Sequence, residues 1–521
     1  MRLVTARARR RRHPSSDATT ILTMRTYRAL TPLLLAAAAG CADLEVTNPS
    51  QRTAETFFRD RDDALLAVNA TYHGLQGLGA FGRWLVFADD MRSDIAFSRS
   101  PWPELANFTR TVLASSDFEV NIQLYQDNYR TIFAANQVIQ RVPEIDMDAT
   151  ERARLVAEAK FIRALSYYNL VTLFANVPLV LEPMTANDRP AAATPAEIWA
   201  QIETDLTEAR AALPASYTGA DVGRATEGAA TALLAKAHLQ QREWPDAAAR
   251  FAEVVGSGRY TLMPNYGDNF REASDNNAES IFEVQFTDQN VLSEGSAGYS
   301  GPKLYGPCGP AFCDANPTRW YFNQFFAENP AVPDPRLDFT IFYNKPGGMD
   351  VFGRPFAERY ADRLADADPD NDLFVKKYTQ WYTTGDEFFD NPINFKVMRL
   401  GGIKLLYAEA LNEANQVEPA RTQLNQVRAR VGLPARPAAG QAQMRDWIEH
   451  EQLMELGFET ERFRFLQRHD RFTATYLPTL IAHDPAFNDF ELGKSELLPI
   501  PNAEVDLNPN VPQNPGWGGA P

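Results

Sequence analysis

The sequence predicts a mainly α-helical protein, in which tetratricopeptide-like helical hairpins form a scaffold that carries a loop-rich lobe with short strands. Apolar residues recur at helical spacing over most of the 521 residues. Two helical segments share one spacing of small and large side chains. Between about residues 265 and 393 this pattern disappears, and glycine, proline, aspartate and aromatic residues dominate.

A signal peptide precedes the predicted folded part. From Met24 the sequence reads MRTYRALTPLLLAAAAGC, with two arginines, an apolar run and small residues before Cys41. The run is too short to span a bilayer. The stretch AAGC resembles a bacterial lipobox, which implies that Cys41 is lipidated and becomes the mature N-terminus. We therefore expect residues 1–40 to be removed, with 1–23 as an upstream extension; a plain secretory signal with an incidental cysteine is the alternative.

The charge of the chain argues against nucleic acid as a partner. The formal net charge is −16, and residues 1–40 contain eight arginines and one aspartate. Their removal leaves 43 basic and 66 acidic side chains, a net charge of −23. Phosphate backbones repel such a protein. Membrane association would then depend on the lipid at Cys41.

The region 41–264 is predicted to be helical with hairpins. Helical periodicity begins near Thr53, breaks over about 80–116, and resumes in LYQDNYRTIFAANQVIQRV and AEAKFIRALSYYNLVTLF. Thr194, Pro195 and Glu197 form the signature of a capped helix start. These signals predict several long helices before residue 264.

Two segments repeat the spacing of a tetratricopeptide-type hairpin. In each, small and large apolar positions follow one another at offsets of 3, 9, 4 and 3 residues. Small residues let two helices approach, and larger ones fill the groove between them. Two unrelated helical hairpins are the alternative. The positions are Ala235, His238, Ala247, Phe251 and Val254 in one segment and Ala408, Leu411, Ala420, Leu424 and Val427 in the other.

The region 265–393 is predicted to be a loop-rich ligand-binding lobe, with short strands such as SIFEVQF. Loops on a rigid frame are where binding residues concentrate. Cys308 and Cys313 lie in CGPAFC, and in an exported protein a local disulfide is the leading interpretation. No histidines stand at the spacing of metal ligands, so neither a metal nor a cofactor is expected.

Several segments, in the expected order, resemble the SusD/RagB-like nutrient-binding lipoproteins. The region 394–521 contains the last of them, a hairpin, a helix and a proline-rich tail. In EHEQLMELGFETERFRFLQRHDRF, Glu451, Glu455 and Arg462 keep the family's charge pattern, whereas His450 replaces its usual arginine. The matching segments are the lipobox, NYRTIFAANQVI, AEAKFIRALSYYNLVTLFANVPLV, PAEIWAQIETDLTEARAALP, GRATEGAATALLAKAHL, YAEALNE with LNQVRARVGLP, and LLPIPNAEVDLNPNVPQNPG.

The resemblance implies a surface-exposed lipoprotein of the outer membrane. It would bind an oligomeric nutrient, a glycan or a peptide, and deliver it to a SusC-like TonB-dependent transporter without cutting it. Loop aromatics favour glycan. The alternatives are a helical-repeat scaffold lipoprotein for envelope assembly and a secreted hydrolase. The resemblance also implies an ordered tail, with Leu497, Leu498 and Ile500 buried and prolines fixing its path.

The ligand-contact residues are chosen from composition, because the family's shared motifs do not include them. Flat aromatic rings can stack on the C–H faces of sugars, and nearby charged groups can bind hydroxyls. For each of these residues, packing within the loops is the alternative. The candidates are Trp84, Asp90, Arg92, Trp102, Tyr299, Tyr305, Trp320 and Trp381.

Overall fold

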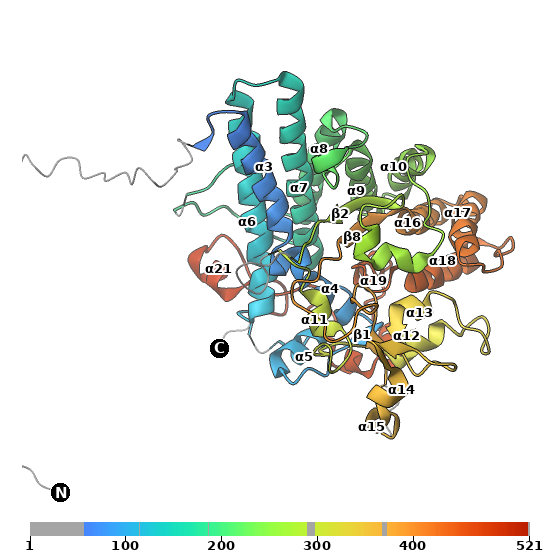
Figure 1. The fold of residues 1–521 in the computed structure, drawn as a ribbon. Coiled ribbons are helices and arrows are strands. Elements are labelled where there is room, and N and C mark those ends of the chain that lie inside the picture. The colour runs from blue at the N-terminus through green and yellow to red at the C-terminus, as the bar shows by residue number, and fades with distance from the viewer. Residues whose placement is uncertain (1–56, 114, 186, 289–296, 367–371, 519–521) are drawn as a thin grey trace, which may run out of the picture. The chain divides into compact units, whose positions relative to one another are not determined.

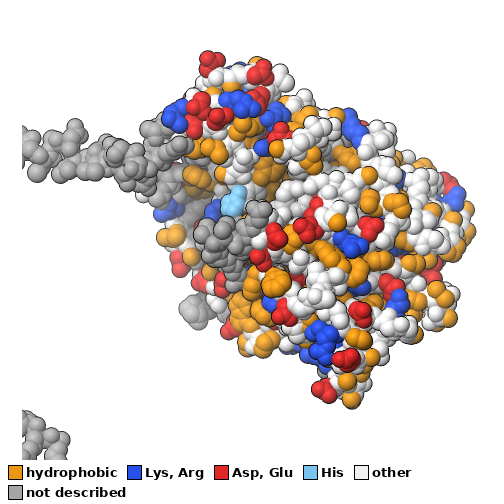
Figure 2. All heavy atoms as spheres, viewed as in Figure 1, with side chains coloured by type: hydrophobic (Ala, Val, Ile, Leu, Met, Phe, Trp, Pro, Cys, Tyr) orange, Lys and Arg blue, Asp and Glu red, His pale blue; other side chains and the backbone are white. Residues whose placement is uncertain are grey.

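The computed structural model describes residues 57–113, 115–185, 187–288, 297–366 and 372–518. The predicted signal peptide and Cys41 lie outside these residues. A single compact unit begins at Phe58. Within the described residues, no helix has both the length and the apolar character needed to cross a membrane. On the face shown in Figure 2, acidic and basic side chains are interspersed with apolar ones.

The first half of the unit is a helical frame (Figure 1), as the apolar periodicity predicted. Helices α3, α6 and α7 pack together, α8 packs on α7, and α9 packs on both α8 and α10. Short helices α4 and α5 lie between α3 and α6 in the chain. The frame helices are α3 (Arg61–Leu75), α4 (Leu85–Ala88), α5 (Pro103–Thr109), α6 (Glu119–Arg141), α7 (Ala149–Phe174), α8 (Pro195–Ala212), α9 (Glu227–Gln240) and α10 (Trp244–Gly256).

Local sequence signals define where these helices begin. Thr194 accepts a hydrogen bond from the backbone N–H of Glu197, whose carboxylate accepts from the backbone N–H of Thr194, so the predicted capping box of α8 is confirmed. Asp60 caps α3 in a similar way by accepting from the N–H groups of Asp62 and Asp63. Such caps satisfy backbone donors that the first helical turn leaves unpaired.

The two segments with matching offsets form helical hairpins. The first is α9 with α10, and the second is α16 (Leu400–Glu413) with α17 (Val417–Arg430). Nine of the ten predicted packing positions are buried, and only His238 is half-buried. The two hairpins also pack on each other through α10 and α16. The two hairpins therefore form one continuous helical scaffold.

The lobe consists of short elements stacked beside the frame. Strand β2 pairs with β8 in antiparallel orientation at the junction between lobe and frame. Strand β1 comes from residues 96–97, far before the predicted lobe, and pairs with β3. The strands are β1 (Ala96–Phe97), β2 (Ser280–Val284), β3 (Asn316–Pro317), β4 (Ile341–Phe342), β5 (Asp350–Val351), β6 (Arg354–Pro355), β7 (Phe374–Val375) and β8 (Phe395–Arg399). The lobe helices are α11 (Gly301–Tyr305), α12 (Arg319–Gln324), α13 (Leu337–Thr340), α14 (Phe356–Arg359) and α15 (Ala361–Leu364).

The C-terminal region returns across both parts of the unit. Its helices are α18 (Gln441–Leu456), α19 (Arg462–Arg468), α20 (Leu477–His483) and α21 (Asn502–Leu507). The tail is ordered: Leu498 and Ile500 are buried, whereas Leu497 is half-buried and not buried as predicted. The backbone N–H of Leu498 donates to the Leu173 carbonyl at 2.8 Å, and Asn514 Nδ2 donates to the Phe174 carbonyl at 2.8 Å. Pairing with the end of α7 thus fixes the path of the tail.

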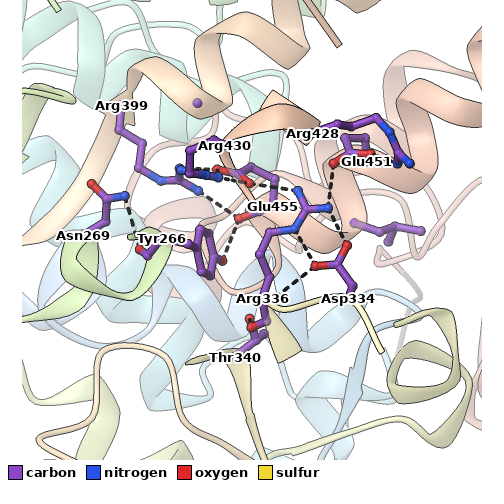
Figure 3. Close-up of polar contacts among 12 residues, drawn as sticks. Tyr266, Asn269, Asp334, Arg336, Thr340, Arg399, Arg428, Arg430, Glu451 and Glu455 are labelled. Atoms are coloured by element: carbon purple, nitrogen blue, oxygen red, sulfur yellow. Dashed lines mark hydrogen bonds and ion pairs between the residues drawn. The ribbon is translucent and has the colours of Figure 1, made fainter. Parts of the chain in front are cut away.

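A buried network of charges joins the scaffold to the lobe (Figure 3). Glu455 on α18 pairs with Arg336 from the lobe at 3.0 Å, Arg399 from the end of β8 at 2.5 Å and Arg430 from α17 at 2.5 Å. Arg399 also pairs with Glu279 at 2.8 Å. These side chains are nearly inaccessible to solvent, so each charge depends on its partners in place of water.

Two of the three charged residues in the sequence motif, Glu451 and Glu455, belong to this network, whereas Arg462 pairs with Asp94 at 2.7 Å. Glu451, one turn before Glu455, pairs with Arg336 at 2.6 Å and Arg428 at 2.8 Å. Burial alone would raise the pKa of Glu455, but the guanidinium groups of Arg430, Arg399 and Arg336 outweigh burial and hold this pKa well below its usual range. His450 takes no part in these pairs, and its Nε2 lies 3.2 Å from the Gln324 carbonyl oxygen.

Replacing Glu455 by alanine is expected to lower the free energy of unfolding by about 3–5 kcal/mol, because three buried guanidinium groups each lose one of their carboxylate partners. The matched control is Glu358→Ala, which removes an exposed pair with Arg354 (3.1 Å) and is expected to cost less than about 1 kcal/mol. Urea unfolding of both variants measures the difference. Equal losses would contradict the structural importance of the network.

Candidate ligand-binding surface

Five of the eight residues predicted to contact ligand are buried. Asp90 accepts hydrogen bonds from the backbone N–H groups of Thr460 at 2.7 Å and Arg462 at 3.3 Å. Arg92 Nη2 donates to the Ser495 carbonyl at 2.8 Å. Both side chains join the early loops to the C-terminal region, so their prediction as ligand contacts is corrected: they fix the early loops against the C-terminal region. The five buried residues are Trp84, Asp90, Arg92, Tyr299 and Tyr305.

The buried aromatic residues of this set form internal contacts. The hydroxyl groups of Tyr305 and Tyr299 lie 3.1 Å apart and bond to each other. The indole Nε1 of Trp84 donates to Gln123 Oε1 at 2.6 Å. Large polar aromatics in a loop-rich lobe thus replace the aliphatic core that regular helices would supply.

Trp320 and Trp381 are half-exposed, but their rings already contact other side chains. Trp320 stacks on His483 of α20, with ring centroids 3.7 Å apart. The Trp381 ring lies 4.3 Å from the Lys376 ammonium and 5.5 Å from the Arg271 guanidinium. Burial lowers the pKa of Lys376 to about 8. The structure therefore gives these two indoles cation and ring partners within the protein.

Trp102 and the buried Trp84 are the predicted residues that belong to one continuous row of aromatic contacts. Trp102 is half-buried at the start of α5, and its ring packs edge-on against Phe118 at 5.2 Å and Trp84 at 6.2 Å. The Arg83 guanidinium lies 5.1 Å from both the Trp84 and the Phe389 ring centroids. We call the whole row the aromatic ridge; its members are Phe118, Trp102, Trp84, Arg83, Phe389 and Phe312.

The Phe312 end of the ridge is exposed to solvent. The Phe312 ring packs on Phe389 at 5.8 Å, yet Phe312 is 52% exposed and the neighbouring Phe388 is 58% exposed. Figure 2 shows apolar side chains gathered over α5 and α11. Exposed large rings are costly in water and mark interaction surfaces when they cluster. The ridge offers flat apolar faces, with a guanidinium beside two of its rings.

A short disulfide loop presents Phe312. Cys308 and Cys313 form a disulfide across the turn. The Lys303 carbonyl accepts from the backbone N–H of Phe312 at 2.9 Å, and Lys303 Nζ donates to the Pro310 carbonyl at 3.0 Å. A ring held in this way loses little conformational entropy on binding. The loop is therefore part of the preformed surface.

A buried acid supports the other exposed rings. Glu387 precedes Phe388 and Phe389, and its carboxylate accepts from the backbone N–H of Gln380 at 2.7 Å and from Asn391 Nδ2 at 2.9 Å. Its own backbone N–H donates to the Pro310 carbonyl of the disulfide loop at 3.0 Å. Burial raises the pKa of Glu387 to about 7, although these hydrogen bonds act to lower it. The ionisation of this group is thus coupled to the folded loops.

One cluster in the described part of the chain has the residue types of a metal site. Glu203, His238 and Glu243 place one ligand atom each within 4.8 Å of one another. Sequence spacing missed the cluster because Glu203 comes from α8, whereas the other two flank the turn between α9 and α10. His238 Nδ1 lies 2.6 Å from Glu243 Oε2, which is the geometry of a surface ion pair. This pair joins frame helices.

The fold and surface define a helical-repeat scaffold that carries an aromatic lobe, and comparisons with known proteins identify the family. The SusD family model matches residues 278–517. A related SusD-like model, described as starch-binding associating with outer membrane, matches residues 44–239. The two models together match both halves of the chain, so the predicted resemblance to the SusD/RagB-like family is confirmed.

Individual relatives agree over nearly the whole length. The SusD-like protein P2 of Formosa agariphila is 25% identical and is matched over 95% of this chain and 100% of its own. A SusD superfamily crystal structure from Bacteroides vulgatus has a TM-score of 0.79 at 25% identity and covers 89% of this chain and 100% of that one. A laminarin binding SusD-like protein has a TM-score of 0.71 at 26% identity, covering 88% of this chain and 100% of that one. The predicted mainly helical fold class is confirmed.

The unfolding free energy should depend on pH through Glu387. A raised pKa means that the folded state holds the proton more tightly than the unfolded state. The contribution of Glu387 to the free energy of unfolding is therefore fully present below about pH 4.5 and is lost as the pH rises through about 7. Glu387→Gln removes the titration. Between pH 5 and pH 8, the wild type is expected to lose roughly 2 kcal/mol more than the variant in urea unfolding. Identical pH profiles would contradict this assignment.

Proposed function

We propose that this protein is a surface lipoprotein that binds oligosaccharide on the aromatic ridge and releases it unchanged to a transporter. The ridge supports the proposal most directly, because exposed rings held by a rigid frame suit the C–H faces of sugars. Similarity to a family with a starch-binding description and a laminarin binding relative supports carbohydrate in preference to peptide. The exposed Phe312 ring and the half-buried rings of Trp102, Phe118 and Phe389 offer the apolar contact that capture of a sugar face needs.

The remaining parts of the proposal rest on the sequence and the family. Cys41 in its lipobox would anchor the protein to the outer membrane, with the folded unit facing outward. A SusC-like TonB-dependent transporter would receive the glycan. Residues 42–56 connect the anchor to the folded unit at Phe58. The capture surface would thus be tethered to the membrane that the nutrient must cross.

Removing an exposed ring of the ridge should weaken glycan binding without harming the fold. Phe312→Ala is expected to weaken binding of laminarin or starch oligosaccharides about tenfold, equivalent to about 1.4 kcal/mol, as for an aromatic contact residue at a binding surface. The matched control is Val332→Ala, which removes another exposed lobe side chain, 64% exposed. Isothermal titration calorimetry measures both. Equal affinities for the two variants, or shortened oligosaccharides after incubation, would contradict the proposal.

The anchor can be tested separately from the binding surface. Cys41→Ala is expected to abolish incorporation of an alkyne-labelled palmitate and to move the protein out of the membrane fraction. Alanine has no thiol that could carry the acyl chains of the anchor. Glycan binding by the released protein should be unchanged. Continued membrane association of the unlabelled variant would contradict the lipid anchor.

A further inference from the structure

A groove separate from the ridge runs between the frame and the C-terminal tail. It lies between α6, residues 178–185 and 188–190, and α21, and its volume is about 690 Å³. Small-molecule sites typically enclose about 300–1,000 Å³ and combine apolar walls with a few polar groups. The groove has this size and this composition.

The floor of the groove is an aromatic stripe on α6. Tyr125, Tyr129 and Phe133 are spaced four residues apart, so they lie on one face of the helix. The rings of Tyr125 and Tyr129 are 4.8 Å apart, and the Tyr129 hydroxyl donates to the Pro178 carbonyl at 2.7 Å. Phe133 is 47% exposed. The stripe therefore changes from the buried ring of Tyr125, through the half-buried ring of Tyr129, to the Phe133 ring that is open to solvent.

Two polar side chains beside the rings have unused hydrogen-bonding capacity. The half-buried Glu504 carboxylate on α21 makes no hydrogen bond or ion pair with the residues that the structure describes. Gln126 accepts only a long contact of 3.4 Å from Arg130, and its Nε2 donates to no described group. A carboxylate and an amide facing one groove can accept from and donate to neighbouring hydroxyl groups.

The walls of the groove are held by cross-links, so it is preformed. Arg189 Nε donates to the Leu507 carbonyl at 2.6 Å, and Asn508 Nδ2 donates to the Pro190 carbonyl at 2.7 Å. The backbone N–H of Ala192 donates to the Asn510 carbonyl at 3.2 Å. A groove held open in this way needs little reorganisation to bind a ligand.

We propose that this groove is a second carbohydrate-binding site that takes an uncharged saccharide segment. The open Phe133 ring would stack on a sugar face, while Gln126 and Glu504 bind its hydroxyl groups. Two carboxylates, Glu504 and Asp188, and two guanidinium groups, Arg130 and Arg189, line the groove. Their charges balance, so the lining gives no preference for a charged sugar over a neutral one. The inference rests on the proposed function only in sharing its ligand class, because no residue belongs to both sites.

Both sites are carried by one helix. Phe118 of the ridge is the N-cap residue of α6, and Tyr125 of the groove follows seven residues later, about 10 Å along the helix axis. Two sites on one rigid element raise the avidity for a polymer that offers many copies of the same unit. The second site would thus keep one part of a polysaccharide bound while another part of the same polymer dissociates from the ridge and rebinds there.

The test uses the full mature chain in detergent, with laminarihexaose and maltoheptaose as probes. Calorimetry is performed on the wild type, on the groove variant Phe133→Ala/Gln126→Ala, and on the ridge variant Phe312→Ala. We expect two saccharides per wild-type chain, at least tenfold weaker binding at one site in each variant, and little change at the other. Thermal unfolding checks that the variants fold, since both aromatic side chains are exposed.

The outcomes separate this inference from the proposed function. One saccharide per chain, weakened by the ridge variant and unaffected by the groove variant, would overturn the second site and leave the proposed function standing. Binding weakened only by the groove variant would support the groove site and overturn the ridge. Binding of a peptide library in the groove with no saccharide bound there would also overturn the inference.

Discussion

The buried pairing of Glu455 with three arginines is the interaction on which the rest of the structure depends. Arg336 belongs to the lobe, Arg399 ends the strand that joins lobe to frame, and Arg430 belongs to the second hairpin. One carboxylate thus connects three parts of the chain that are far apart in sequence. Since each buried charge needs its partners, the lobe cannot shift on the scaffold without exposing or unpairing them. This constraint keeps loops with few regular elements in one arrangement.

The proposed binding surface depends on this rigidity. Trp102 packs on Phe118 and Phe312 packs on Phe389, and the Arg83 guanidinium beside the Phe389 ring connects these two parts of the ridge. Fixed loops lower the entropy lost when a ligand binds, which is the usual benefit of a preorganised site. The disulfide loop and the hydrogen bonds of buried Glu387 likewise fix the loops that carry Phe312 and Phe389, at the solvent-exposed end of the ridge. The frame, network and lobe therefore act together.

Local signals in the sequence were sufficient for the scaffold. The capping box at Thr194, the periodicity of α6 and α7 and the matching offsets of the two hairpins all appear as helices, because each depends on neighbours within one or two turns. The ordered tail was also foreseen, since buried Leu498 and Ile500 stand among its prolines. The family's charge motif identified Glu451 and Glu455, although it did not reveal which arginines they meet.

The binding surface could be predicted only in part, because exposure is decided by distant contacts. Trp84, Tyr299 and Tyr305 lie in glycine-rich, loop-like sequence, yet they fill the core of the lobe. Arg83, Phe118 and Phe389 were missed, since nothing local distinguishes a ridge residue from a packing residue. Phe312 within CGPAFC and the FF pair after Glu387 were the available signals: aromatic residues beside turn-forming sequence. Of the predicted residues, Trp84 and Trp102 belong to the ridge; Trp84 is buried and Trp102 is half-buried, and the contact of Trp102 with a ligand stays a prediction.

The central claim is that loops held by buried charge present aromatic rings to an intact glycan. A crystal structure of the protein with a bound laminarin or starch oligosaccharide tests it most directly. The account predicts unbroken sugar rings in contact with Phe312 and Trp102, with the lobe in the arrangement described. An oligosaccharide bound only at surfaces remote from the ridge, or a rearranged lobe in which the Glu455 pairs have separated, would contradict it.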